Sequence, residues 1–386
     1  MNFVKKNPIN TNVTSTDVSV DTEDNYLNIT ELIKKNNYTS EEYTVITNDG
    51  YRLKMFRIPG HGPVVFVMHG LLCSADDLVT PGVNAGIAFL LAQKGYDVWM
   101  GNARGTKHSR SNIYTSPSEK QFWDFSFHEI GFIDLPTMID FVLEKTQRKT
   151  LTYIGHSQGT TAFYVMCSLL PEYNEKINLM ISLSSVAWMS NIISPIRYGV
   201  PIFEEVHELF KILDIHEIFP DSPLVKLYQK AFCKHNLGAF IFCQQFASVM
   251  GGSNIEQTNF EHLSVIYNHF PAGSSVKQYV HYAQLVRSGY FRQYDYKLLN
   301  LQKYGTHAPP SYPVEKITAP IAIFYGKGDL LSELVDVKKL TSKLPNFIEL
   351  YTVEDTNFSH FDFIYARDIG TLVFPKILSL LGKFSK

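Results

Sequence analysis

Short, unbroken apolar runs separated by helix-length segments constrain the fold of this chain more than any other feature. The runs "PVVFVM", "YDVWM", "LTYI" and "NLMISL" lack the apolar–polar alternation of half-exposed strands, and "PIAIFY" and "FIELYTV" follow after residue 318. Strands that are buried on both faces belong to parallel sheets, whose right-handed crossovers are usually helical. The sequence therefore predicts an α/β fold, with a mainly parallel central sheet and helices on both faces.

Helical and hairpin patterns fill the intervals around these runs. Segment 127–145 has apolar residues at helical spacing with a candidate helix start at Pro136, segment 158–170 has a helical pattern, and segment 363–381 is amphipathic. Before the first buried strand, apolar and polar residues alternate on both sides of an Asn-Asp-Gly turn at 48–50. This pattern predicts a β-hairpin.

The chain divides into four predicted parts. Residues 1–25 are polar and predict a flexible arm, residues 26–183 and 319–386 carry the two parts of the α/β core, and residues 184–318 form an insert. The insert is rich in aromatic, Met and Leu residues without regular strand spacing. It predicts either a helical subdomain with its own small core, or a lid whose apolar underside covers a binding cleft.

Charge and apolar-run length exclude several classes of partner. With 35 basic and 37 acidic residues and no local Lys/Arg cluster, the chain is not expected to bind nucleic acid. No apolar run approaches the length of a membrane span, and the basic start is not followed by the apolar segment of a signal peptide. Four Asn-x-Ser/Thr sequons, which decide nothing alone, are present at Asn12, Asn28, Asn37 and Asn357.

The four cysteines are too few for a disulfide scaffold and lack the CxxC spacing of a zinc site, so we expect no metal. Cys233 and Cys243 alone are close enough in sequence to suggest a local bridge.

The pentapeptide "GHSQG" at 155–159 is the first candidate for chemistry. A Gly-x-Ser-x-Gly pattern arises by chance in roughly one chain in ten of this length. Here a predicted strand precedes it and a predicted helix follows it, which is the context of a nucleophilic serine on a sharp turn. Gly155 and Gly159 would relieve crowding around Ser157, and the helix start would favour negative charge beside it.

A serine nucleophile needs a base, and the base needs an acid that orients it. His156 is unsuited because neighbouring residues across such a turn project in different directions. Asp329 follows one predicted strand and His360 follows the next, in the order nucleophile, acid, base. Other acids and bases are weaker candidates, because none of them lies at the end of a predicted core strand. The weaker acids are Asp336, Asp355 and Asp362, and the weaker bases are His281 and His307.

Two backbone N–H groups are predicted to stabilise the oxyanion of an acyl transfer. One belongs to Gln158, directly after the candidate nucleophile, and the other to Leu71, in the loop after "PVVFVM". His69-Gly70 is compatible with a simple turn, but its position after that strand favours the oxyanion role.

Several longer motifs resemble the acid lipase family, which contains the gastric and lysosomal acid lipases and their insect relatives. They are "EEYTVITNDGYRL", "HGLLCSADD", "GYDVWMGNARGTKHSR", "FWDFSFHEIGFIDLP", "GHSQGTT", "HFPAGSSVKQYVHYAQLVRSGYFRQYD", "GKGDLL" and "SHFDF". The resemblance extends from about residue 43 to the end. It implies an α/β-hydrolase fold with a cap over residues 184–318, and hydrolysis of triacylglycerols and sterol esters at a lipid–water interface without a cofactor.

Residue roles also follow from the resemblance. It implies Ser157 as nucleophile, Asp329 as acid and His360 as base, with Leu71 and Gln158 as oxyanion donors. It further implies a secreted or lysosomal glycoprotein and a cap disulfide that Cys233 and Cys243 would form. In the same motifs, Arg104 is interpreted as scaffolding.

Three features do not fit the family pattern simply. The family is made with a signal peptide, which this chain does not show, so either a signal peptide was removed before the numbering or the protein stays inside the cell. His128 stands where the family more usually has Asp, and the sequon at Asn357 lies so close to His360 that we expect it to be unoccupied. Two other functions stay open: a lipid-binding or storage protein without the chemistry, and an esterase for shorter acyl groups. The sequence says nothing about oligomeric state.

Overall fold

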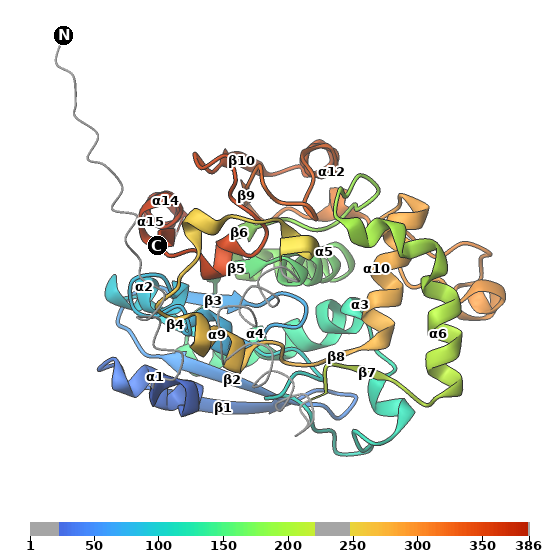
Figure 1. The fold of residues 1–386 in the computed structure, drawn as a ribbon, viewed down its shortest axis with the longest axis horizontal. Helices are drawn as coiled ribbons and strands as arrows, with labels where there is room; N and C mark the ends of the chain where they lie inside the picture. Colours follow the sequence, from blue (N-terminus) through green and yellow to red (C-terminus); the bar gives the residue numbers. More distant parts are fainter. Residues whose placement is uncertain (1–22, 221–247, 385–386) are drawn as a thin grey trace, which may run out of the picture.

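The computed structural model describes residues 23–220 and 248–384, whose strands form a large sheet and a separate two-stranded one (Figure 1). The large sheet has eight strands in the order β1-β2-β4-β3-β5-β6-β9-β10. The strands are β1 (Glu41–Ile46), β2 (Arg52–Ile58), β3 (Val64–Met68), β4 (Asp97–Met100), β5 (Leu151–His156), β6 (Ile177–Leu183), β7 (Glu217–Ile218), β8 (Ser274–Ser275), β9 (Ile321–Tyr325) and β10 (Phe347–Thr352).

Every neighbouring pair from β4 to β10 in this order is parallel, which confirms the predicted mainly parallel sheet. The antiparallel strands are β1 and β2 at one edge. They form the predicted hairpin, with Ile46 opposite Arg52 across the Asn-Asp-Gly turn.

Helices cover both faces of the sheet, as predicted. On β3, Phe66 and Met68 point into the core shared with α4 and α5, whereas Val65 and Val67 point into the core shared with α2 and α15. The helices are α1 (Ile29–Lys35), α2 (Ile87–Gln93), α3 (Phe127–Glu129), α4 (Leu135–Thr146), α5 (Gln158–Leu169), α6 (Phe203–Ile212), α9 (Leu263–His269), α10 (Val276–Ser288), α11 (Asn300–Tyr304), α12 (Leu334–Thr341), α13 (Asp362–Tyr365), α14 (Ile369–Leu372) and α15 (Phe374–Phe384).

Two helical segments differ in detail from their sequence patterns. The helix expected to start near Pro136 begins at Leu135 and continues directly from a π-helical turn, Ile130–Asp134. The amphipathic segment 363–381 forms parts of three helices, α13 to α15. The first break falls at Ala366, whose backbone is extended, and the second precedes Pro375, which lies in the first turn of α15 and has no N–H to continue α14.

The described part of the insert between β6 and β9 contains α6, the small β7–β8 sheet, α9, α10 and α11. Helices α6 and α10 pack together at one end of the molecule (Figure 1). The predicted pair Cys233 and Cys243 lies outside the described residues. None of the described helices combines the length and the apolar character that a membrane crossing requires.

An ion-pair network ties the hairpin turn to the core. The Arg104 side chain is 1% exposed, and its Nε donates to Asp134 Oδ1 at 2.8 Å while its Nη1 donates to Asp49 Oδ2 at 2.6 Å. Its guanidinium also lies 4.1 Å from the centroid of the Tyr51 ring. Because Asp134 is fully buried, removing its charge would leave the Arg104 cation poorly compensated.

We expect Asp134→Asn to lower the free energy of unfolding by about 3 kcal/mol, since the buried Arg104 cation would keep only the partly exposed Asp49 as a counter-charge. The measurement is urea unfolding followed by circular dichroism. Glu208→Gln is the control, because Glu208 pairs with Lys211 on the exposed face of α6 and such pairs contribute little. Equal unfolding midpoints for the two variants would contradict this account of Arg104.

Candidate active site

Ser157 sits on the turn between β5 and α5 in a strained backbone conformation, with φ +51° and ψ −115°. Its N–H donates to Leu183 O at 3.1 Å, and its carbonyl accepts from the N–H of Thr160 at 2.8 Å. A Cβ on Gly155 would lie 2.9 Å from Gly159 O, and a Cβ on Gly159 would lie 2.4 Å from a β3 carbonyl. Glycine is therefore required on both sides of this turn.

The structure brings Ser157, His360 and Asp329 into one chain of contacts. His360 Nε2 lies 2.8 Å from Ser157 Oγ. His360 Nδ1 lies 3.0 Å from Asp329 Oδ1 and 3.1 Å from Asp329 Oδ2. Asp329 follows β9 and His360 follows β10, so the three groups meet where parallel strands end.

Asp329 is placed to remain ionised. Burial alone would raise the pKa of its carboxyl, but the charge and hydrogen bond of His360, the hydroxyl of Ser184 and the Ser332 N–H together lower that pKa below its usual value. The carboxylate can therefore hold the proton of His360 at Nδ1, which leaves Nε2 as an acceptor facing Ser157.

His156 does not face Ser157 and is held as a neutral side chain. Its Nε2 lies 2.9 Å from the backbone oxygen of His360 and donates to it. Burial, and then the nearby His360, lower the pKa of His156 to about 3. His156 therefore supports the loop that carries His360.

The weaker acid and base candidates lie in other contacts within the described residues. Asp336 accepts from the backbone N–H of Asn191, Asp355 from the side-chain amide of Asn254, and Asp362 from the N–H of Ser359. His281 lies 2.9 Å from Ser126 Oγ, and His307 is exposed.

The loop after β3 lies against Ser157. A Cβ on Gly70 would be 3.2 Å from Ser157 Cβ, and Leu71 lines the same cavity as Ser157. His69 braces this loop, because its Nε2 accepts from Ala103 N–H at 3.1 Å and its Nδ1–H donates to Gly70 O at 2.8 Å. Burial lowers the pKa of His69 to about 4, so this neutral form persists.

Gln158 is the first residue of α5, directly after Ser157. The first N–H groups of a helix have no partner inside it, so its N–H is free to bind an anion there. Of the two predicted oxyanion donors, Gln158 thus follows Ser157 in the chain, and Leu71 lines the same cavity as Ser157.

An apolar cavity of about 460 Å³ opens at Ser157 and His360. Helices α6 and α10 form part of its wall with Phe203, Val206 and Phe210 on one side and Tyr282, Ala283 and Val286 on the other. Such a cavity would accept long hydrocarbon chains more readily than polar groups.

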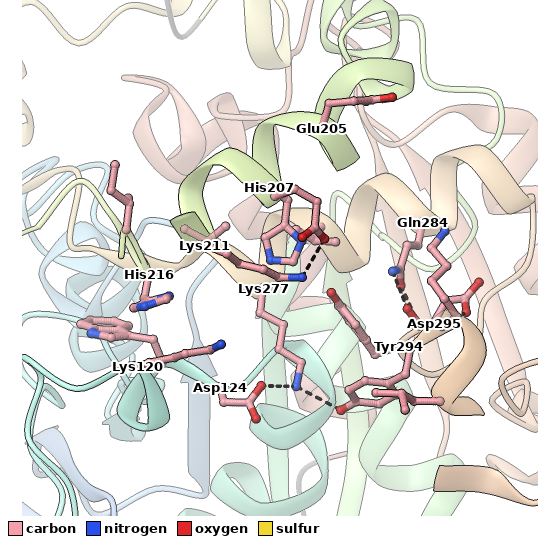
Figure 2. Close-up of a pocket in the computed structure, with 18 residues that line it drawn as sticks. Lys120, Asp124, Glu205, His207, Lys211, His216, Lys277, Gln284, Tyr294 and Asp295 are labelled. Atoms are coloured by element: carbon pink, nitrogen blue, oxygen red, sulfur yellow. Dashed lines mark hydrogen bonds and ion pairs between the residues drawn. The ribbon is translucent and has the colours of Figure 1, made fainter. Parts of the chain in front are cut away.

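A larger cavity, of about 760 Å³, lies on the other side of α6 and α10, and its lining is charged (Figure 2). Lys277 Nζ lies 2.7 Å from Asp124 Oδ1 and 3.0 Å from Tyr296 Oη there. The described residues that line it include no serine, threonine or cysteine. Its only described hydroxyl groups are the phenols of Tyr294 and Tyr296, and no Ser–His–Asp arrangement like that of Ser157 is found among its described lining residues.

The described residues contain no cluster of histidine, cysteine and carboxylate side chains that would hold a metal ion. Their two cysteines, Cys73 and Cys167, are buried free thiols. Asn28 caps α1 through its side chain, whereas Asn357 is exposed.

One polar residue beside the candidate triad, Ser184, was not predicted from the sequence. Ser184 Oγ lies 2.5 Å from Asp329 Oδ2 and 2.6 Å from His360 Nδ1. The only sequence signal was its position directly after a predicted strand, since Asp329 and the other predicted site residues also lie in loops that follow predicted strands.

Comparison with known proteins agrees with the fold described above. A family model of the α/β hydrolase fold matches residues 63–366, and a model of a partial α/β-hydrolase lipase region matches residues 29–82. An α/β hydrolase from Penicillium sp. sh18 has a similar solved structure, with a TM-score of 0.54 at 14% identity, over 90% of this chain and 99% of that one.

Two human proteins are similar over most of their length. Gastric triacylglycerol lipase from Homo sapiens is 37% identical, over 93% of this chain and 92% of its own. Lysosomal acid lipase/cholesteryl ester hydrolase from Homo sapiens is 34% identical, over 95% of this chain and 93% of its own.

Two adjacent buried carboxyls near the loop after β3, Asp76 and Asp77, have pKa values that are shifted in opposite directions. Burial raises the pKa of Asp77 to about 6, despite hydrogen bonds from Tyr365 and Ser74. For Asp76, burial would also raise the pKa, but the Lys107 charge and the contacts with His108 and His269 hold it well below the usual range.

The two carboxyls predict opposite effects on stability. Between pH 4 and 6 the folded state holds a proton on Asp77 that the unfolded state loses, so stability falls as pH rises through this window, by on the order of 3 kcal/mol. Asp76 contributes stability above its unfolded pKa, near 4, and this contribution is lost as pH falls through its lower folded pKa.

We therefore expect Asp77→Asn to raise the melting temperature at pH 7.5 and to change it little at pH 4.5, because it removes a buried charge that forms only at higher pH. Asp76→Asn should lower the melting temperature at pH 7.5. Differential scanning fluorimetry from pH 4 to 8 would measure both, and shifts of the same sign at pH 7.5 would contradict the assignment.

Proposed function

Because this chain belongs to the acid lipase family of α/β hydrolases, we propose that it is a serine lipase or sterol esterase that hydrolyses the carboxylic ester bonds of neutral lipids. The observation that carries the proposal is the chain of contacts from Asp329 through His360 to Ser157, at the wall of an apolar cavity. A hydroxyl that contacts a carboxylate-oriented imidazole can act as a nucleophile at a carbonyl carbon.

Acylation begins when Ser157 Oγ attacks the ester carbonyl carbon and His360 Nε2 takes the hydroxyl proton. Asp329 stabilises the resulting imidazolium and keeps its other proton at Nδ1. The negative charge on the former carbonyl oxygen is stabilised by the N–H groups of Leu71 and Gln158, each worth about 3–4 kcal/mol in comparable sites.

The tetrahedral intermediate then collapses. The bond from the carbonyl carbon to the alkoxide oxygen breaks, and His360 donates its Nε2 proton to the leaving alcohol. Water next attacks the acyl carbon while His360 accepts one of its protons. The bond from the acyl carbon to Ser157 Oγ then breaks, His360 returns the proton to Ser157 Oγ, and the fatty acid leaves. No cofactor is needed for either half of the reaction.

The substrate class follows from the cavity and the relatives together. The cavity beside Ser157 is lined mainly by apolar side chains, which suits acyl chains or a sterol. Two relatives are named for triacylglycerols and cholesteryl esters. The insert over residues 184–318 would form the cap above this cavity, and the substrate would be taken from a lipid–water interface.

The proposal extends to location. Relatives named gastric and lysosomal suggest that this protein is secreted or lysosomal and glycosylated at some of its sequons. Asn357 would be the exception, because a glycan there would lie three residues from His360.

Ser157→Ala should lower hydrolysis of a long-chain ester by at least about 10³-fold, because the attacking group is lost, without changing the melting temperature. A fluorophosphonate probe should label the wild-type protein at Ser157 and leave the variant unlabelled. Labelling of neither protein, with no ester turnover by the wild type, would favour a lipid-binding protein without catalysis.

Triolein, cholesteryl oleate and a short-chain ester should separate the remaining alternatives when each is assayed across pH. We expect both long-chain esters to have higher kcat/KM than the short-chain ester, because the apolar cavity gains binding energy from each buried methylene group. The Ser157→Ala protein is the background control. A strong preference for the short-chain ester would instead indicate an esterase of small substrates.

A further inference from the structure

Ser184 occupies a strained backbone position directly after β6. Its φ is +53°, which is unusual for a serine, and its N–H donates to Phe324 O on β9 at 3.1 Å. Its side chain is fully buried. This backbone conformation fixes the direction of the Cα–Cβ bond, and the hydroxyl contacts fix the rest of the side chain.

The hydroxyl lies between the acid and the base of the candidate triad. Ser184 Oγ is 2.5 Å from Asp329 Oδ2 and 2.6 Å from His360 Nδ1, whereas the two direct Asp329–His360 contacts are 3.0 Å and 3.1 Å. A carboxylate can only accept, so the single hydroxyl proton goes to Asp329. The hydroxyl oxygen is then free to accept from the Nδ1–H of His360.

We propose that Ser184 is a positioning residue of this site, whose hydroxyl bridges Asp329 to His360 and holds the imidazole with Nε2 directed at Ser157. The proposal rests on the proposed function. It adds a fourth side chain to the three that the sequence pointed to.

The other contacts of Asp329 show why the bridge matters. Asp329 Oδ1 accepts from the backbone N–H groups of Leu331 and Ser332, both at 2.9 Å. Oδ2 has Ser184 and His360 as its partners among the described residues. Without the Ser184 hydroxyl, that oxygen would be held by His360 alone, and the carboxylate could turn relative to the imidazole.

The charge balance gives the sign of a pH effect. Besides His360, the titratable groups that interact with the Asp329 charge are His156, Tyr325 and Glu333, and none of them changes with Ser184. The Ser184 hydroxyl is one of the groups that lower the pKa of Asp329, so removing this donor makes protonation of the carboxylate, and loss of its hold on the imidazole, more favourable as pH falls. The acid limb of the activity profile should therefore move to higher pH.

The test is Ser184→Ala in the full chain, assayed on a long-chain ester from pH 3 to 8. We expect kcat to fall at least tenfold, because a hydrogen bond to a charged group is lost. KM should stay nearly constant, since Ser184 does not line the apolar cavity. The acid limb of kcat/KM should shift upward in pH.

Ser185→Ala is the matched control. This neighbouring hydroxyl is also buried, at 4% exposure, but it contacts Tyr164 Oη at 2.7 Å. The control should keep both kcat and the pH profile of the wild type.

Ser184→Gly separates chemistry from folding. Glycine adopts positive φ without strain, so this variant should be at least as stable as Ser184→Ala and yet equally impaired in kcat. Wild-type kcat and an unshifted acid limb in both Ser184 variants would overturn the proposal. So would activity losses that simply follow the melting temperatures of the variants.

The wild-type protein distinguishes failure of this proposal from failure of the proposed function. Ester turnover and fluorophosphonate labelling of the wild type, with unaffected Ser184 variants, would refute only the role of Ser184. Their absence from the wild type would refute both.

Discussion

The geometry around Ser157 depends on how closely the first turn of α5 approaches the end of β3. A Cβ on Gly159 would lie 2.4 Å from Met68 O, so no other residue fits without moving one of the two elements. This approach keeps the turn sharp and holds Ser157 at a positive φ, a strain that costs on the order of 1–3 kcal/mol. The burial of β5 between two strands and beneath helices on both faces offsets that cost.

The same sheet order brings the remaining groups together. Strands β3, β5, β6, β9 and β10 are parallel neighbours in that order, so their carboxyl ends share one edge. The loops that leave this edge carry Leu71, Ser157, Ser184, Asp329 and His360, respectively. Each group needs only a short loop, and the rigid sheet sets the distances between them. The buried imidazoles near the site, His69 and His156, are held neutral, so they add no positive charge beside Asp329 and His360.

Much of this arrangement was predictable because each predicted part of the candidate site follows a strand that the sequence reveals. The runs before Ser157 and Asp329 are apolar without alternation, a further strand was predicted before His360, and the three residues follow the expected chain order of nucleophile, acid and base. The sequence did not predict the π-helical turn at 130–134 or the division of 363–381 into three helices. Those features depend on how helices pack and where a proline falls, and apolar spacing does not encode them.

Ser184 was not predicted as a site residue for a different reason. It is also the first residue of the predicted insert. Its side chain leaves a backbone position with a positive φ, and nothing in a Ser-Ser pair distinguishes a strained residue from an ordinary loop residue. The insert is predicted to begin at 184, and its first residues are hydrogen-bonded to the α/β core. The Ser184 N–H donates to Phe324 O on β9, Ser185 O accepts from Ser332 Oγ at 2.6 Å, and the Val186 N–H donates to Thr160 Oγ1 on α5 at 2.9 Å. The first residues of the insert are thus fixed beside the candidate site, so a movement of the insert would have to hinge beyond them.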